Sequence, residues 1–255
     1  MLLAIDIGNT NITLGVFDKD NLRATWRMAT ETNRTPDQYG VELLALLHHR
    51  DINRAEITEI AVCSVVPPLL GTFVDLCTRY FHIPPFVVGP GIKTGVRIRM
   101  DNPKEVGADR IIDAIAAHAL YGGPIIIVDL GTAITFDTIS KEGDYLGGAI
   151  APGLPIAAEA LFTHTAALPR IQLIPPKRAI GTNTIDAMQS GLIFGYVGLI
   201  EGIIARIQSE LGGKVLVVAT GGYASLFSAK TNIFDKVNSD LTLIGLRLVH
   251  EMNKG

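Results

Sequence analysis

Short apolar runs alternate along the whole chain with longer segments of helical periodicity. Runs of four to eight apolar residues bounded by turn residues are typical of buried strands, and apolar positions recurring every three or four residues are typical of helices. Strands are expected at 2–5, 12–17, 22–30, 59–66, 85–89, 125–130 and 214–220, and helices at 36–49, 69–81, 103–121, 156–163, 184–211 and 241–252. This alternation predicts an α/β fold.

The ends of these elements carry helix-boundary and loop signals. Thr35 is a suitable N-cap for the first helix. Asn102 is expected to cap the helix at 103–121, and Gly122–Gly123 to end it. The stretch GGAIAPGLP at 147–155 is expected to be a loop.

The opening pattern returns halfway along the chain. IDIGNTNITLGVFDKDN at the N-terminus matches VDLGTAITFDTISKEGD after residue 127, and each copy has an apolar run, an aspartate, a glycine, threonines and an alternating strand. Asp6 and Asp129 are therefore equivalent positions about half a chain apart. Two unrelated hairpins with similar turns remain the alternative, but a duplicated lobe is favoured, with lobes at 1–117 and 118–255.

Composition narrows the class of protein. The 255 residues have a formal net charge of −3, with 48% hydrophobic and 18% charged residues. This excludes a disordered chain and gives no electrostatic reason to expect nucleic acid or an anionic membrane as a partner. The two cysteines fit a reducing compartment, and Cys63 is expected to be a small buried hydrophobe. No export signal or membrane-spanning run is recognised, so a cytoplasmic location is expected.

Three glycine-bearing turns follow apolar strands, at Asp6–Thr10, Asp129–Thr132 and Thr220–Gly222. Glycine allows the backbone to approach a ligand closely, and successive N–H groups at such turns bind phosphate. The aspartates would repel bare phosphate, so they indicate a cation. The chain contains neither a GxxxxGK[ST] loop nor a GxGxxG motif.

The segment NPKEVGADR supplies a second kind of chemistry. Asp109 could accept a proton from a hydroxyl, and Arg110 could bind a carboxylate or phosphate. A surface ion pair within a helix is the alternative for these neighbours. No histidine has metal-ligand spacing, and no serine has a nucleophile context.

The long helix carries glycines at 191, 195, 198 and 202, all on one face. Each interior glycine costs a helix about 1 kcal/mol relative to alanine. A close backbone neighbour is expected there, either a helix of the same chain or a second copy.

Together these motifs resemble the type III pantothenate kinases, of the acetate and sugar kinase/Hsp70/actin superfamily. The matching pieces are DIGNT at 6–10, NPKEVGADR at 102–110, DLGTA at 129–133, GGAIAPG at 147–153 and TGG at 220–222. The resemblance implies two ribonuclease-H-like lobes in the actin-like ATPase fold, with ATP in the cleft between them. It implies transfer of the γ-phosphate of Mg–ATP to pantothenate, the first step towards coenzyme A. A homodimer is expected separately, with the glycine face of the long helix at or near its interface.

The same resemblance assigns roles to individual residues. Asp109 would be the general base, and Asp129 would bind a monovalent cation, potassium or ammonium. ATP would contact Asp6, Ile7, Gly8, Asn9, Thr10, Asn11, Ile12, Thr13 and Thr132. Pantothenate would contact Met100, Gly107, Ala108, Asp109, Arg110 and Thr184. Met100 departs from the family, which usually has a tyrosine there, so a hydroxyl hydrogen bond to substrate would be lost.

Two other readings stay open at this point. One is a kinase of another small alcohol, such as a sugar, on the same fold. The other is a non-catalytic nucleotide-dependent regulator or actin-like filament protein.

Overall fold

The computed structural model describes residues 1–254 and divides into two compact units. The first unit contains Met1–Val96, Asn102–Ala116 and the C-terminal segment from Asp240, and the second contains Arg97–Asp101 and Ala117–Ser239. Helix α3 (Ala108–Tyr121) runs from one unit into the other. The units thus differ from the expected lobes at 1–117 and 118–255, chiefly because the C-terminal segment joins the first unit.

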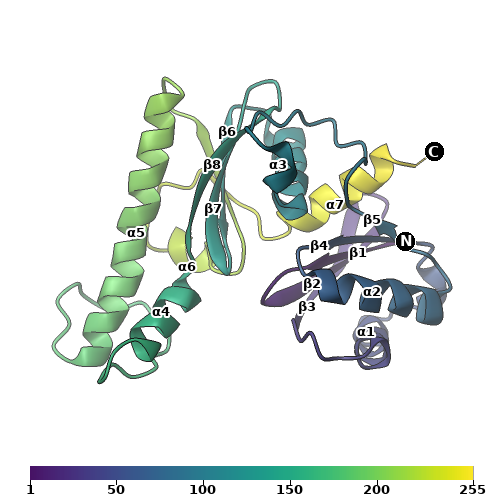
Figure 1. The fold of residues 1–255 in the computed structure, drawn as a ribbon, viewed down its shortest axis with the longest axis horizontal. Coiled ribbons are helices and arrows are strands. Elements are labelled where there is room, and N and C mark those ends of the chain that lie inside the picture. Colours follow the sequence, from purple (N-terminus) through teal and green to yellow (C-terminus); the bar gives the residue numbers. More distant parts are fainter. Residues whose placement is uncertain (255) are drawn as a thin grey trace. The chain divides into compact units, whose positions relative to one another are not determined.

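The first unit is built on a five-stranded sheet of order β3-β2-β1-β4-β5 (Figure 1). β1 pairs antiparallel with β2 and parallel with β4, so Asp6 lies opposite both Thr13 and Cys63. The strands are β1 (Leu2–Ile7), β2 (Asn11–Asp18), β3 (Asn21–Ala29), β4 (Glu59–Ser64) and β5 (Phe86–Val87).

Helices cover both faces of this sheet. α1 (Pro36–His49) and α2 (Pro67–Leu76, continued by a π-helical turn at Cys77–Phe81) pack their buried side chains against Leu3, Ile5 and Ile7. α7 (Leu241–Met252) covers the opposite face, where Leu243 fills the space above Gly15 of β2. Figure 1 shows α7, yellow, and α1 and α2, blue, on opposite sides of the strands.

The second unit repeats the arrangement with a sheet of order β10-β9-β6-β7-β8. Its central strand again pairs antiparallel with the next strand and parallel with a later one. The strands are β6 (Ile125–Leu130), β7 (Ala133–Ile139), β8 (Tyr145–Pro152), β9 (Leu216–Thr220) and β10 (Lys236–Val237). The matching order in both sheets confirms the duplication.

The helices of the second unit are α4 (Leu154–Thr163), α5 (Thr184–Glu210) and α6 (Ala224–Ser228). α5 contributes Ile193, Tyr196 and Ile200 to a buried cluster with Ile126 and Val128 of the central strand. By length and composition α5 could span a membrane, and 33% of its most apolar window is buried. The expected absence of a membrane partner stays a prediction.

Two predicted elements differ from the structure. The helix expected at 103–121 is broken: a 3-10 turn at Pro103–Glu105 precedes α3, and Asn102 does not cap it but donates to Glu105. The stretch expected to be a loop at 147–155 is mostly strand, because β8 continues to Pro152 beside β7. The short elements α6 and β10 were not predicted.

Candidate functional site

The turn between β1 and β2 is closed by its own backbone. The N–H of Gly8 donates to the carbonyl of Asn11 at 3.0 Å, and a Cβ on Gly8 would lie 3.0 Å from that same oxygen. A larger residue would therefore crowd the turn, which explains the glycine. Asn9, Thr10 and Asn11 are exposed at its tip.

Asp109 lies in the first turn of α3. One of its carboxylate oxygens, Oδ1, accepts a hydrogen bond from the N–H of Arg110 at 2.9 Å. A Cβ on Gly107 would collide with that oxygen, so the glycine leaves the carboxylate its space. The unsatisfied N–H groups at a helix N-terminus favour an ionised carboxylate, the form that accepts a proton.

The electrostatics of Cys63 show which carboxylates gather in the first unit. Burial raises the pKa of this thiol well above its ordinary value, and Asp6, Asp109 and Asp113 raise it further. All three carboxylates therefore lie within electrostatic reach of one buried sulfur on β4. Asp6 and Asp109 thus act on the same buried thiol, and the structure confirms that Cys63 is buried.

In the second unit, Asp129 is the penultimate residue of β6 and lies beside two glycines. It lies opposite Thr220 and Thr135 in the ladder. Gly221, at φ 89°, has no room for a Cβ, which would collide with the Asp129 carboxylate and lie 2.7 Å from the N of Leu130. A Cβ on Gly131 would lie 3.6 Å from the same carboxylate. Gly221 therefore leaves the Asp129 carboxylate the space that it occupies.

Thr132 lies against the end of β8. Its carbonyl accepts from the N–H of Gly153 at 3.0 Å, and a Cβ on Gly153 would collide with that carbonyl. The Tyr196 hydroxyl of α5 holds the preceding residue by donating to the carbonyl of Pro152 at 2.9 Å. The turns at Asp129–Thr132 and Thr220–Gly222 and the APG segment therefore meet within one unit.

Met100 and Thr184 both belong to the second unit but lie in different places. The Met100 sulfur lies 3.0 Å from where a Cβ on Gly147 would be, and Gly147 itself has φ 116°. Thr184 is the first residue of α5 and lines a cavity of about 940 Å³ between α4 and α5. Gly107–Arg110 belong to the first unit.

A magnesium ion that arrives with substrate phosphates fits the carboxylates of this site. Among residues 1–254 no group of three or more His, Cys, Asp or Glu side chains is arranged to hold a metal ion. Mg²⁺ is commonly bound by one or two carboxylates together with substrate phosphates. Asp6 beside the glycine turn suits that mode.

Sequence reasoning missed the contacts that hold these turns. The requirement for Gly221 and Gly153 comes from Asp129 and Thr132, which are distant in sequence, so no local signal reveals it. Thr30, which bonds to the turn at Asp6–Thr13, was likewise taken only as the end of a strand.

Comparison with known families gives a match to the type III pantothenate kinase model over residues 2–206. Among curated relatives, a type III pantothenate kinase of Dehalococcoides mccartyi is 54% identical, covering 99% of this chain and 96% of the relative. One of Moorella thermoacetica is 51% identical, covering 99% of this chain and 100% of the relative.

Solved structures with a similar fold are more distant in sequence. A Campylobacter jejuni protein described as a Baf family transcriptional activator has a TM-score of 0.61 at 21% identity, covering 98% of both chains. Component A of the (R)-2-hydroxyglutaryl-CoA dehydratase of Acidaminococcus fermentans has a TM-score of 0.56 at 12% identity, covering 99% of both chains. These likenesses show the fold, in agreement with the expected actin-like class.

Proposed function

The chain belongs to the type III pantothenate kinase family, and from that premise we propose that it phosphorylates pantothenate with ATP. The product is 4'-phosphopantothenate, on the path to coenzyme A. The observation that carries the proposal is the match over nearly the full length of relatives that share this activity in their names. The GADR segment at 107–110, held in a defined geometry, supplies the acid–base group for it.

The reaction transfers one phosphoryl group. The terminal hydroxyl oxygen of pantothenate forms a bond to the γ-phosphorus while the bond from that phosphorus to the bridging oxygen of ADP breaks. The hydroxyl proton passes to the carboxylate of Asp109. Such transfers depend on positioning and charge neutralisation more than on covalent catalysis.

Asp109 suits the role of general base because its carboxylate is held at a helix N-terminus. The N–H of Arg110 donates to Oδ1 at 2.9 Å, and the carboxylate is assigned to the substrate hydroxyl. Arg110 offers a guanidinium that can bind the pantothenate carboxylate by two hydrogen bonds. Gly107 and Ala108 have little or no side chain, so they do not obstruct the approach of substrate to this end of the helix.

The turn at Asp6–Thr13 is assigned to the phosphates of ATP, with Thr132 as a further contact. Its support is the closed glycine turn with three exposed polar residues at its tip. Magnesium bound to the phosphates would supply charge neutralisation, and Asp6 would hold it. Asp129, between its two glycines, is assigned to potassium or ammonium.

Thr184 and Met100 complete the proposed pantothenate contacts. Met100 offers a thioether in place of a phenol. An apolar contact is expected there without a hydrogen bond.

The homodimer is proposed from the glycine face of α5. Gly191, Gly195 and Gly198 are exposed, and no atom of residues 1–254 outside their own helix turns lies within 4 Å of the Cβ each would carry. A helix of the same chain therefore does not explain them. A second copy packing on this face would.

A coupled assay of ADP release tests the function. Release is expected only with Mg–ATP and pantothenate together, and faster in potassium than in sodium. A panel of sugars and other small alcohols separates this function from that of a related kinase. Pantothenate-independent ATP hydrolysis alone would contradict the proposal.

A further inference from the structure

Thr30 holds the turn between β1 and β2 by two hydrogen bonds. Its N–H donates to the carbonyl of Thr10 at 3.0 Å, and its hydroxyl donates to the carbonyl of Gly8 at 2.7 Å. One residue just beyond β3 therefore binds two carbonyls of the turn that lies ahead of β2.

The bond to Gly8 also fixes an N–H. In a trans peptide the C=O and N–H point in opposite directions. Because the Gly8 oxygen is directed at Thr30, the N–H of Asn9 in the same peptide is directed away from it. Rotation of this peptide would exchange a donor for a carbonyl oxygen at the turn, and an anion is attracted by the first and repelled by the second.

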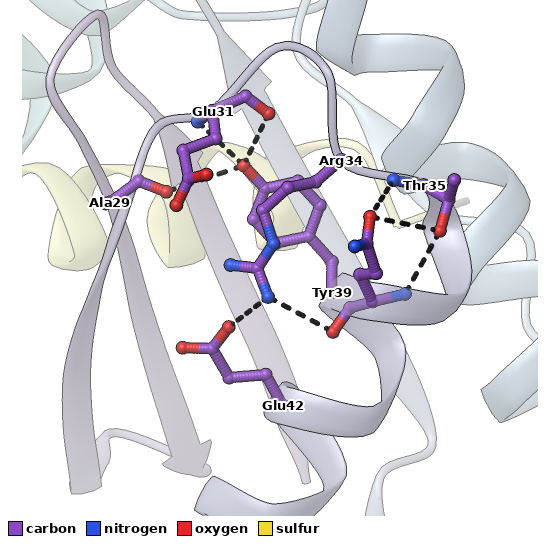
Figure 2. A network of polar contacts seen from close by, with 7 residues as sticks. Ala29, Glu31, Arg34, Thr35, Tyr39 and Glu42 are labelled. Carbon is purple, nitrogen blue, oxygen red and sulfur yellow. Dashed lines mark hydrogen bonds and ion pairs between the residues drawn. The ribbon is translucent and has the colours of Figure 1, made fainter.

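Thr30 is in turn held by a buried tyrosine. The Tyr39 hydroxyl accepts from the N–H of Glu31 at 2.9 Å and donates to the carbonyl of Glu31 at 3.0 Å, and it lies 3.4 Å from the carbonyl of Ala29 (Figure 2). Both neighbours of Thr30 are thereby fixed to one side chain of α1.

Tyr39 has little freedom to move. Its side chain is fully buried, and its ring lies 5.0 Å from that of Phe73, centre to centre. The Arg34 guanidinium lies 4.4 Å above the same ring and pairs with Glu42 at 2.6 Å. Figure 2 shows Arg34 over the tyrosine, with Glu42 beyond it.

We propose that Thr30 is a positioning residue for nucleotide binding: it orients the Gly8–Asn9 peptide with its N–H toward the phosphates of ATP, and Tyr39 holds Thr30 in place. The proposal rests on the assignment of the turn at Asp6–Thr13 to ATP in the proposed function. It concerns phosphate binding, so pantothenate binding should be unaffected.

The test compares Thr30→Val with Thr30→Ser. Valine keeps the branched shape but cannot donate to Gly8, whereas serine keeps the hydroxyl. We expect Thr30→Val to lower kcat/KM for ATP about tenfold and to weaken Mg–ATP binding in calorimetry, with KM for pantothenate unchanged. Thr30→Ser is expected to restore both ATP values.

A matched control removes the same kind of bond elsewhere in the first unit. The Thr78 hydroxyl donates to the carbonyl of Val74 at 2.9 Å. Thr78→Val should leave the kinetics of both substrates unchanged. If Thr30→Val and Thr78→Val have similar thermal stability but only Thr30→Val lowers kcat/KM for ATP, the effect comes from positioning and not from general destabilisation.

A second pair of variants tests the support by Tyr39 and does not depend on the folding of Thr30→Val. Tyr39→Phe removes the hydroxyl but keeps the ring, and it is expected to lower kcat/KM for ATP in the same direction by a smaller factor. Tyr80→Phe, which removes a hydroxyl bonded to Asp37 at 2.8 Å, is the control.

The outcomes are distinguishable. The proposal would be overturned if Thr30→Val showed wild-type ATP binding and kinetics. It would also be overturned if Thr30→Ser lost as much ATP binding and kcat/KM for ATP as Thr30→Val. A wild-type protein that binds Mg–ATP but does not phosphorylate pantothenate would contradict the proposed function only, and the effect of Thr30→Val on ATP binding would still support its role. A wild-type protein that binds no Mg–ATP would overturn both.

Discussion

At the scale of single residues, the proposed chemistry depends on Asp109 and Asp129. Neighbouring glycines leave space for both carboxylates. Gly107 leaves room for the first carboxylate, and Gly221 leaves room for the second. A sequence motif shows such glycines, but only the structure shows which carboxylate each of them faces.

Asp109→Asn keeps the shape of the side chain but cannot accept the hydroxyl proton. General-base catalysis contributes about 10²–10⁴-fold to the rate. When the transition state is loose, the contribution of the base is expected at or below the lower end of that range. We expect kcat to fall at least about tenfold with KM for ATP little changed. Steady-state kinetics measure this change. The control is Asp37→Asn, because Asp37 also lies in the first turn of a helix. Near-wild-type kcat across neutral pH would show that Asp109 only positions substrate.

Asp129→Asn should lower activity and its potassium dependence together. A carboxylate near phosphate charge is unfavourable unless a cation offsets the repulsion, which is about 4 kcal/mol for unit charges 4 Å apart at an effective dielectric of 20. Initial rates measured in potassium, sodium and tetramethylammonium salts test the assignment. Equal wild-type rates in all three would remove its basis.

At the scale of elements, hydrophobic periodicity predicted most strands and helices, and the ends were less certain. Thr35 caps α1 with a complete capping box, as its sequence signal indicated. The helix expected from Pro103 begins instead at Ala108, since apolar spacing does not reveal the break that places Asp109 in a first turn. β8 was mistaken for a loop because its glycines conceal the alternation.

α7 shows a packing that no local pattern encodes. Gly245 lies directly against the carbonyl of Ile112 in α3, with no room for a Cβ. His250, near the end of α7, is 8% exposed and lies 5.5 Å from the ring of Phe86. Its Nδ1 lies 3.7 Å from Glu59, which also pairs with Lys254.

The free energy of unfolding should therefore decrease as the pH is lowered, partly because of His250. Burial lowers the pKa of His250, and the charge of Lys254 lowers it further. Glu59 and Glu251 raise this pKa but do not outweigh burial. A histidine whose folded pKa is lowered favours the folded state above its unfolded pKa of about 6.5, and this contribution is lost as the pH falls through the folded value.

We expect the free energy of unfolding to fall less between pH 7.5 and 5.5 in His250→Gln than in the wild type. Urea denaturation at the two pH values measures it, with the exposed His48→Gln as the control. An unchanged pH dependence in His250→Gln would show that another group is responsible.

At the scale of the whole molecule, the repeat of one motif in the sequence correctly predicted two sheets of matching order. The assignment of the C-terminal segment to the first unit could not be predicted, because it depends on α7 packing against β1, β2 and β4 at the other end of the chain. The glycine face of α5 was expected to have a close backbone neighbour, but within residues 1–254 no atom lies within 4 Å of the Cβ positions at Gly191, Gly195 and Gly198. The homodimer stays a prediction.

Gly198→Leu should reduce the dimer without disturbing the monomer. The space at Gly198 is open within the chain, so a leucine fits the folded unit but would obstruct a close second copy. Light scattering at micromolar concentration measures the assembly, with Gly213→Leu, at another open glycine, as the control. A monomeric wild type would contradict the proposed dimer.

The central claim is that this chain moves the γ-phosphate of ATP to pantothenate. Phosphorus-31 NMR of wild-type protein with Mg–ATP in potassium buffer follows that phosphate directly. With pantothenate present, the γ-phosphate signal should be replaced by a phosphomonoester signal in equal amount to the ADP formed, and neither change should occur without pantothenate. Conversion of the γ-phosphate to inorganic phosphate, or no conversion by folded protein, would contradict the account.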